Sequence, residues 1–205
     1  MKYLKLFLVV LSLFVFSTCL ADSASNKLAL LLSRYQTYQA DFTQYVYDQH
    51  NRLIQKSNGS MSLMRPGRFR WETLEPVNSI VMTNGSSLWN YNVDLMQATV
   101  QALPKGQNLN AALLLSGNIR KVIHDFKIKA MSENRFEITP KLKNNNFIWV
   151  QLGFFKNRLN EMSIKNNLGQ TTTFKFYDIK ENITFKTSDF EFRAPNGVDV
   201  IRQTQ

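Results

Sequence analysis

The sequence predicts a mainly β fold, either an antiparallel barrel or a strongly curved sheet, with only a few short helices. Apolar and polar residues alternate with the two-residue period of a strand in several runs: 68–71, 96–100, 148–152 and 172–177. Turn signals separate such runs: Asn58-Gly59, Asn84-Gly85, residues 143–146, Lys156-Asn157 and Asn196-Gly197. About ten or eleven short strands at this spacing favour antiparallel pairing over alternating βαβ units.

The first helical pattern precedes all of the strands. Its apolar positions follow the 3.6-residue period: Leu28, Leu31, Leu32 and Tyr35. Ser25 and Asn26 are possible caps at its start. The pattern therefore predicts one short amphipathic helix ahead of the sheet.

The second helical region interrupts the strands. A helix is predicted over 107–115, because Pro104 lies before it and Gly117-Asn118 forms a good stop after it. The apolar spacing at 119–126 indicates a further short turn. The apolar stripes of these helices need a partner, so the helices either plug one mouth of the curved sheet or cover its concave face.

The amino-terminal residues are predicted to be a secretory signal peptide. Two lysines precede an almost unbroken apolar run over residues 6–16, and small residues occupy the cleavage positions at Cys19 and Ala21. We expect cleavage after Ala21, which leaves residues 22–205 as a single exported domain. The alternative is lipid attachment to Cys19, although the residues before this cysteine match a lipoprotein signal poorly.

The exported chain is expected to be basic and without a disulfide. The sequence has 25 Lys and Arg against 15 Asp and Glu, so removing the two leader lysines lowers the net charge from +10 to about +8. The single cysteine lies in the leader, so stability must come from packing, which the 15 phenylalanines permit. The scattered basic residues indicate a solvated surface, or steering toward an acidic partner or anionic membrane, and nucleic acid is not expected as a partner.

The sequence carries no recognisable catalytic or metal-binding motif. Its two histidines, His50 and His124, are far apart, and His, Cys and carboxylates do not cluster at metal-ligand spacing. Glu72 and Glu75 can be considered as an acid–base pair, but this spacing is common by chance. We therefore expect no enzyme activity, no cofactor and no metal.

Several short motifs, taken together, resemble the LolA family of periplasmic lipoprotein carriers. They are, in chain order, Asp41-Phe42-Thr43-Gln44, Arg65-Pro66 followed by Phe69 and Trp71, Pro76, Asn84-Gly85, Leu88-Trp89-Asn90-Tyr91, Gln97-Ala98-Thr99, and Phe-Glu-Phe-Arg-Ala-Pro-Asn-Gly-Val-Asp-Val at 190–200. Each motif alone is weak, but their order and spacing are fairly specific. The resemblance covers nearly the whole chain after the leader.

The resemblance implies an incomplete, half-open antiparallel β-barrel of about 11 strands, with a lid of short α-helices over a concave apolar cavity. It also implies a soluble, monomeric chaperone of the periplasm. Such a chaperone accepts acylated lipoproteins from the inner-membrane Lol ABC transporter, shields their acyl chains and passes them to the outer-membrane receptor LolB.

The resemblance assigns roles to individual residues as well. Arg65 matches an arginine that locks the empty lid through backbone carbonyls, and a guanidinium suits this role because it has five fixed donors and a permanent charge. Alternation places Phe69 and Trp71 on one face of strand 68–72 and Arg68 and Arg70 on the other. The expected acyl-chain contacts are Phe69, Trp71, Ile80, Met82, Trp89, Tyr91, Leu113 and Leu114. We expect Arg68 and Arg70 to face partners.

Three other functions stay open at this point. The chain can be a membrane-anchored receptor of the same fold, like LolB, or a generic binder of envelope lipids or glycolipids. It can also be a secreted hydrolase that uses Glu72 and Glu75. The Arg65-Pro66 match and the poor lipoprotein signal before Cys19 favour the soluble carrier, while ordinary core packing remains the alternative role for Phe69 and Trp71.

Overall fold

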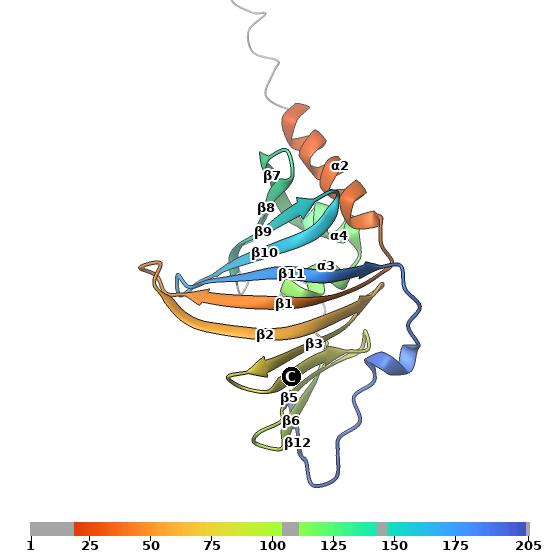
Figure 1. Cartoon of the computed structure of the whole chain (residues 1–205). Helices are drawn as coiled ribbons and strands as arrows, with labels where there is room; N and C mark the ends of the chain where they lie inside the picture. Colours follow the sequence, from red (N-terminus) through yellow and green to blue (C-terminus); the bar gives the residue numbers. More distant parts are fainter. Residues whose placement is uncertain (1–18, 104–110, 143–146, 204–205) are drawn as a thin grey trace, which may run out of the picture.

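Twelve strands form one continuous open sheet in the computed structural model, which describes residues 19–103, 111–142 and 147–203 (Figure 1). The strands are β1 (Thr37–Tyr47), β2 (Leu53–Met64), β3 (Arg68–Glu75), β4 (Ser79–Thr83), β5 (Ser87–Asn92), β6 (Gln97–Ala102), β7 (Phe126–Ser132), β8 (Arg135–Pro140), β9 (Phe147–Phe155), β10 (Arg158–Asn166), β11 (Thr171–Glu181) and β12 (Asp199–Gln203). Their order across the sheet is β12-β6-β5-β4-β3-β2-β1-β11-β10-β9-β8-β7, so the sheet is not closed. The predicted half-open, mainly β fold is confirmed.

One strand departs from the predicted antiparallel pattern. β12 pairs in parallel with β6, with Asp199 opposite Gln97, whereas every other neighbouring pair is antiparallel. The reason is that the chain between β11 and β12 first crosses the sheet, as Figure 1 shows, and so β12 returns in the direction of β6. This added edge strand raises the predicted ten or eleven strands to twelve.

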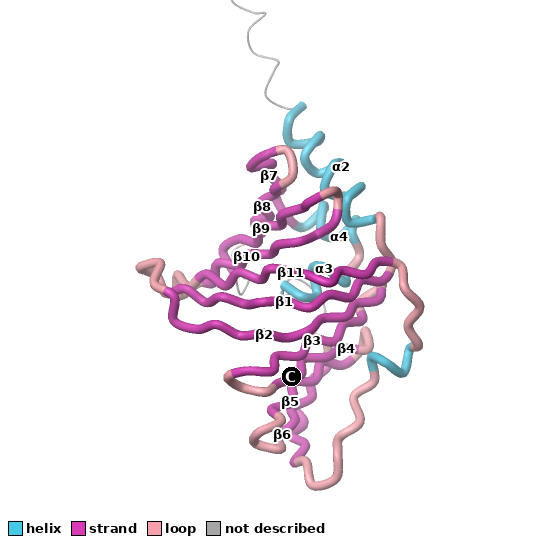
Figure 2. Tube along the Cα trace, in the orientation of Figure 1, coloured by secondary structure: helices cyan, strands magenta, loops and turns pink. Residues whose placement is uncertain are grey.

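The helices lie on one side of the curved sheet. They are α2 (Cys19–Ser33), α3 (Ala111–Ser116), α4 (Ile119–Asp125) and the 3₁₀ turn η2 (Thr187–Phe190). Figures 1 and 2 show the sheet curving around α3 and α4, with α2 beside the edge that ends in β7. α2 contacts β7 and α4, and α3 contacts β2 and β3. Of the two predicted arrangements, the structure therefore has helices over the concave face.

The predicted helices are present with different boundaries. Leu28, Leu31 and Leu32 of α2 are buried, as the spacing predicted, but the helix does not begin at Ser25 or Asn26. It runs from Cys19, because residues 19–24 contain no helix breaker. The helix predicted over 107–115 is described only from Ala111, and residues 107–110 lie outside the described chain.

The predicted helix stop at Gly117-Asn118 is confirmed. α3 ends at Ser116, and Asn118 caps α4 because its side chain accepts a 2.9 Å hydrogen bond from the amide of Arg120. The two short helices are therefore joined directly, and they form one covering layer.

Most of the predicted turns are confirmed, but the one at Asn58-Gly59 is wrong. Lys156 and Asn157 have the positive φ angles (50° and 63°) that a two-residue hairpin requires. Asn58 and Gly59 lie instead inside β2, at a register shift opposite β3. A Cβ on Gly59 would meet the ring of Phe42 at 2.6 Å and the Glu72 carbonyl oxygen. The glycine thus serves close packing and not a reversal of the chain.

We predict that Gly59→Ala destabilises the protein by about 3 kcal/mol, because the added methyl group has no room between a backbone carbonyl and a buried ring. Gly153→Ala is the matched control: its nearest contact would be Glu161 Cβ at 3.3 Å, which a shift of a few tenths of an ångström relieves. This control should cost less than about 1 kcal/mol. Urea unfolding measures both values, and equal losses would contradict the prediction.

Candidate functional site

The turn between β2 and β3 holds the lid, by which we mean α2, α3 and α4. The amide of Arg65 donates to the carbonyl of Gln36, just after α2, at 2.9 Å. The amide of Gly67 donates to the carbonyl of Ser116, the last residue of α3, at 2.8 Å. Gly67 has a φ of 73°, which favours glycine. Two helices that are far apart in the sequence therefore end at one short turn.

The side chain of Arg65 strengthens this junction. Its Nη1 donates to the carbonyls of Leu32 and Tyr35, and its Nη2 donates to the carbonyl of Leu115 at 2.8 Å. The last carbonyls of a helix lack partners within the helix, and they carry the negative end of its dipole. Hydrogen bonds to a charged donor contribute about 1.5–3 kcal/mol each. Arg65 thus joins the carboxy-terminal ends of α2 and α3.

The concave face beneath the lid is an aromatic cluster. Phe69 and Trp71 of β3 are buried, as alternation predicted, and Trp71 lies 4.6 Å from Phe42 and 4.7 Å from Phe174 between ring centroids. Phe176 lies next to both Trp71 and Phe174. We call these five rings the concave aromatic cluster. Leu114 of α3 is buried in the same core, whereas the side chain of Leu113 lies outside the described part of the structure.

The sequence-based list missed several residues of this face, namely Phe42, Met61, Leu63, Phe174 and Phe176. Phe174 and Phe176 are two residues apart in the alternating run at 172–177, and this period alone shows that they share one face of the strand. It does not show which face is concave. Pairing puts Phe42 with Phe176 and Met61 with Trp71 on one face, and the packing of Leu114 of α3 in the same core shows that this face is the concave one.

Four residues predicted to contact acyl chains lie on the opposite face of the sheet. They are Ile80, Met82, Trp89 and Tyr91. The register pairs Arg70 with Met82 and Met82 with Trp89, so these side chains share the convex face of Arg70. The prediction that they line one cavity with Phe69 and Trp71 is therefore wrong. Directly paired residues share a face of the sheet. Even-numbered residues of β4 pair with even-numbered residues of β3 but with odd-numbered residues of β5, so Trp89 and Tyr91 lie on the face of Arg70.

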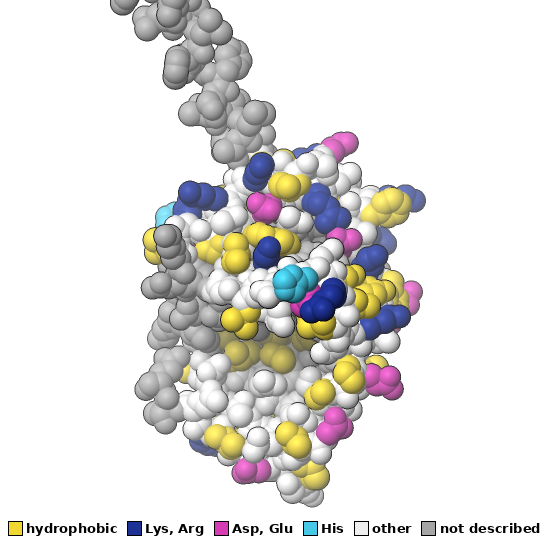
Figure 3. All heavy atoms as spheres, turned by 90° about the vertical axis from the view of Figure 1, so that its left-hand side faces the viewer, with side chains coloured by type: hydrophobic (Ala, Val, Ile, Leu, Met, Phe, Trp, Pro, Cys, Tyr) yellow, Lys and Arg dark blue, Asp and Glu magenta, His cyan; other side chains and the backbone are white. Residues whose placement is uncertain are grey.

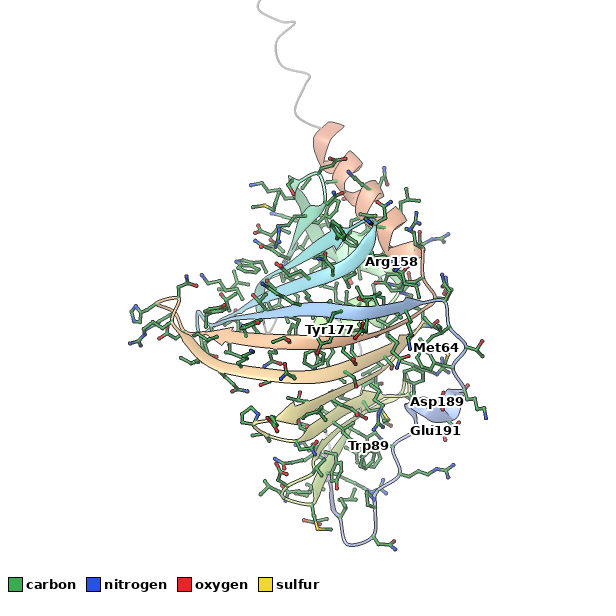
Figure 4. The ribbon with its side chains drawn as sticks, viewed as in Figure 1. Met64, Trp89, Arg158, Tyr177, Asp189 and Glu191 are labelled. Atoms are coloured by element: carbon green, nitrogen blue, oxygen red, sulfur yellow. The ribbon has the colours of Figure 1, made fainter. Side chains whose placement is uncertain are left out.

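The carboxy-terminal segment covers this convex face. Phe192 stacks on Trp89 with ring centroids 4.8 Å apart and lies 5.3 Å from Tyr91. In Figure 4, Trp89 lies on the front of the sheet, where the segment that carries Asp189 and Glu191 passes. A pocket of about 530 Å³ remains between Ile80, Tyr91 and residues 188–195. The aromatic residues of β5 thus serve to anchor the chain before β12.

Arg68 and Arg70 lie on the outer face, as predicted, but neither is fully exposed. Arg70 forms an ion pair with Glu72 on its own strand and lines the pocket beneath residues 188–195. The side chain of Arg68 is half-buried, and its Nε has no hydrogen-bond partner among the described residues. Both side chains therefore belong to the packing layer on the convex face. Their contact with partners stays a prediction.

Acid–base chemistry finds no support in this arrangement. Glu72 is engaged in an ion pair with Arg70, and Glu75 is exposed at the end of the same strand, beyond a register shift. His50 and His124 are both exposed, and His124 pairs with Asp125 at 2.7 Å. Within the described ranges, no three His, Cys, Asp or Glu residues lie close enough to hold a metal ion.

The lid is bordered by open space on two sides. A groove of about 570 Å³ runs between α2 and α4, with Leu30, Ile119 and Ile123 along it and Arg65 at its base. Figure 3 shows a hollow with hydrophobic side chains at its floor, on the face seen from the left of Figure 1.

No helix in the described ranges is long and apolar enough to span a membrane.

Two buried tyrosines beside Arg65 link stability to pH. Burial raises the pKa of both Tyr35 and Tyr38, and for Tyr35 the charge of Arg65 opposes part of this rise. The folded protein therefore holds the two phenol protons more tightly than the unfolded chain does. In the unfolded chain the phenols titrate at about pH 10. Stability from these groups is complete below about pH 10 and is lost as the pH rises above it.

We therefore predict that the free energy of unfolding falls above about pH 10, and that Tyr35→Phe reduces the slope of this fall. Urea unfolding at intervals from about pH 8 to 11 measures it, with Tyr177→Phe, a half-exposed tyrosine of β11, as control. The same slope in wild type and Tyr35→Phe would contradict the linkage.

Comparison with known proteins agrees with this geometry. The family described as "Outer membrane lipoprotein carrier protein LolA" matches residues 33–193, which include β1 to η2, Arg65 and the concave aromatic cluster. A solved structure described as an uncharacterized conserved protein from Thermus thermophilus has a TM-score of 0.53 at 14% identity, over 87% of this chain and 99% of the other. That likeness concerns the fold alone.

Sequence relatives are much closer. The outer-membrane lipoprotein carrier protein of Coxiella burnetii (strain CbuK_Q154) is 41% identical over 99% of this chain and 100% of the relative. The corresponding protein of Legionella pneumophila (strain Corby) is 38% identical over 97% and 99% of the two chains. With a family match across most of its length and relatives this similar from end to end, the chain belongs to the LolA family of outer-membrane lipoprotein carrier proteins.

Proposed function

We propose that this protein is a periplasmic chaperone that carries acylated lipoproteins between the two membranes of the envelope. It accepts them from an inner-membrane ABC transporter of the Lol type, shields their acyl chains against the concave aromatic cluster and passes them to an outer-membrane receptor such as LolB. Family membership supports the cargo. The observation that carries the proposal is the Arg65 clamp on the ends of two helices that cover an apolar face.

A carrier of lipid needs a means of release that uses no nucleotide. Burial of an acyl chain is worth about 0.8 kcal/mol per methylene, so a simple apolar pocket would hold its cargo too tightly. A lid that packs on the same surface competes with the cargo. Each hydrogen bond of Arg65 that re-forms on lid closure offsets part of the acyl-binding free energy. The described structure is then the closed, empty state.

The acyl chains would occupy the space that the lid side chains fill when it is closed. Phe69 and Trp71, together with the cluster residues Phe42, Phe174 and Phe176, form the wall. Leu114, which packs there in the closed state, would be displaced. Leu113 remains a predicted contact. The hollow in Figure 3 is the proposed entrance, since hydrophobic side chains line its floor.

Export requires removal of the leader, for which we propose cleavage after Ala21. This leaves residues 22–205 as one domain, and it preserves the part of α2 that carries Leu28, Leu31 and Leu32. The lid therefore does not depend on the residues that are removed.

The first experiment adds purified residues 22–205 to spheroplasts that contain a labelled outer-membrane lipoprotein. We expect the lipoprotein in the supernatant as a one-to-one complex, and then its transfer to membranes that carry the receptor. Arg65→Leu should load normally but transfer at least about tenfold less, because the closed lid loses three charge-assisted hydrogen bonds.

Arg34→Leu is the matched control, since Arg34 is exposed beside the same helix end. It should load and transfer like wild type. Lipoprotein that stays on the spheroplasts while the added protein is folded would remove the carrier function. Normal transfer by Arg65→Leu would remove the lock while leaving the carrier function in place.

A pair of tryptophan variants tests which face binds lipid. Trp71→Ala should weaken the binding of a fluorescent long-chain fatty acid by about tenfold or more, because it deletes a large ring from the proposed wall. Trp89→Ala, on β5 and the convex face, should change this affinity by less than about twofold. Fluorescence titration measures both affinities, after circular dichroism has established that each variant is folded. The reverse order of effects would place the lipid on the convex face.

A further inference from the structure

Tyr35 lies between the end of α2 and the start of β1, directly against Arg65. Only 1% of it is exposed, and the guanidinium carbon of Arg65 lies 4.3 Å from the centre of its ring. The backbone carbonyl of the same tyrosine accepts a hydrogen bond from Nη1 of Arg65. Tyr35 thus contacts the clamp in two ways, through its carbonyl and through the face of its ring.

The ring makes the second contact through its face. The Tyr35 hydroxyl is buried near enough to Arg65 for the guanidinium to lower its pKa, but within the described residues it has no partner at full hydrogen-bond geometry. A guanidinium that lies over an aromatic face is attracted by the ring quadrupole, and this attraction is strongest where water is excluded. The Nε of Arg65 likewise has no hydrogen-bond partner in the described chain.

The position of the ring is fixed from behind. Tyr38 packs against Tyr35 with ring centroids 5.2 Å apart, and the Tyr38 hydroxyl donates to the carbonyl of Leu159 at 2.6 Å. Tyr38 also contacts Phe176 of the concave aromatic cluster edge to face, at 6.2 Å. The platform under Arg65 is therefore part of the sheet-side core.

We propose that Tyr35 is a positioning residue for the lid clamp: its ring orients the Arg65 guanidinium toward the three helix-end carbonyls. The free energy that holds the lid closed then depends on the Tyr35 ring as well as on the three carbonyls. The role in lipoprotein release rests on the proposed carrier function, but the effect on the lid does not. Without the ring, the guanidinium samples other rotamers and the helices open more often.

The test is hydrogen–deuterium exchange of the lid amides at residues 24–33 and 114–116, in the protein without cargo. Tyr35→Leu should raise their exchange rates by about tenfold or more, the size expected for a desolvated cation–π contact, while the amides of β1, β10 and β11 keep theirs. Tyr35→Phe keeps the ring and should exchange like wild type within about twofold. The control is Tyr45→Leu, which removes a tyrosine that contacts Lys175 at 5.7 Å on the sheet itself and should leave the lid unchanged.

A double variant separates positioning from ordinary packing. If Tyr35 acts through Arg65, then Tyr35→Leu adds less than about twofold to the lid exchange of Arg65→Leu. A further increase of about tenfold would show that the ring stabilises the lid by itself and would overturn the proposal, as would faster exchange in Tyr35→Phe. If Tyr35→Leu fails to fold, Tyr35→Met, which keeps apolar volume without a ring face, replaces it in every comparison.

These measurements contain no lipoprotein, so they are independent of the spheroplast assay. Faster lid exchange without lipoprotein release would leave the Tyr35 assignment intact and remove the carrier function. Lipoprotein release in the spheroplast assay, together with unchanged lid exchange in Tyr35→Leu, would leave the carrier function intact and remove the Tyr35 assignment.

Discussion

The fold depends on one guanidinium that binds the ends of two helices. Arg65 donates to three carbonyls: those of Leu32 and Leu115, in the last turns of α2 and α3, and that of Tyr35, just after α2. The helices are short and could not persist on an exposed sheet through their own propensity. The clamp and the apolar stripe of each helix keep them over the concave face. In the proposed carrier, these few bonds are the ones that break when the lid opens.

The sheet separates two tasks between its faces. The concave face carries the aromatic cluster and the lid, and it is the proposed lipid surface. The convex face carries Trp89 and Tyr91, which hold Phe192 and so bring the chain round to β12. The edge of β6 is thereby paired and not left open to another chain. Opening the lid on one face need not disturb this second packing layer on the other.

Much of the architecture could be read from local patterns. Alternation located most strands, the helical spacing found α2 and α4, and Arg65-Pro66 with Phe69 and Trp71 led to the family and to the clamp. The errors have a common origin. Asn58-Gly59 has the composition of a turn, yet it lies inside β2. Glycine is needed there because Phe42 and the backbone at Glu72 approach too closely for any side chain. Composition cannot report a neighbour that comes from another strand.

The sequence by itself determined that this chain forms a curved, mostly antiparallel sheet with helices beside it, and that Phe69 and Trp71 share a face opposite Arg68 and Arg70. Only the tertiary structure decided which faces of successive strands coincide. Trp89 and Tyr91 have the same odd-numbered spacing as Phe69 and Trp71, but the pairing of Met82 with Trp89 places them on the convex side. Alternation fixes faces within one strand, whereas the register set by connections and by pairing fixes them across a sheet. The contact between the Tyr35 ring and Arg65 joins a helix end to a turn that is distant in the sequence, so no local pattern predicts it.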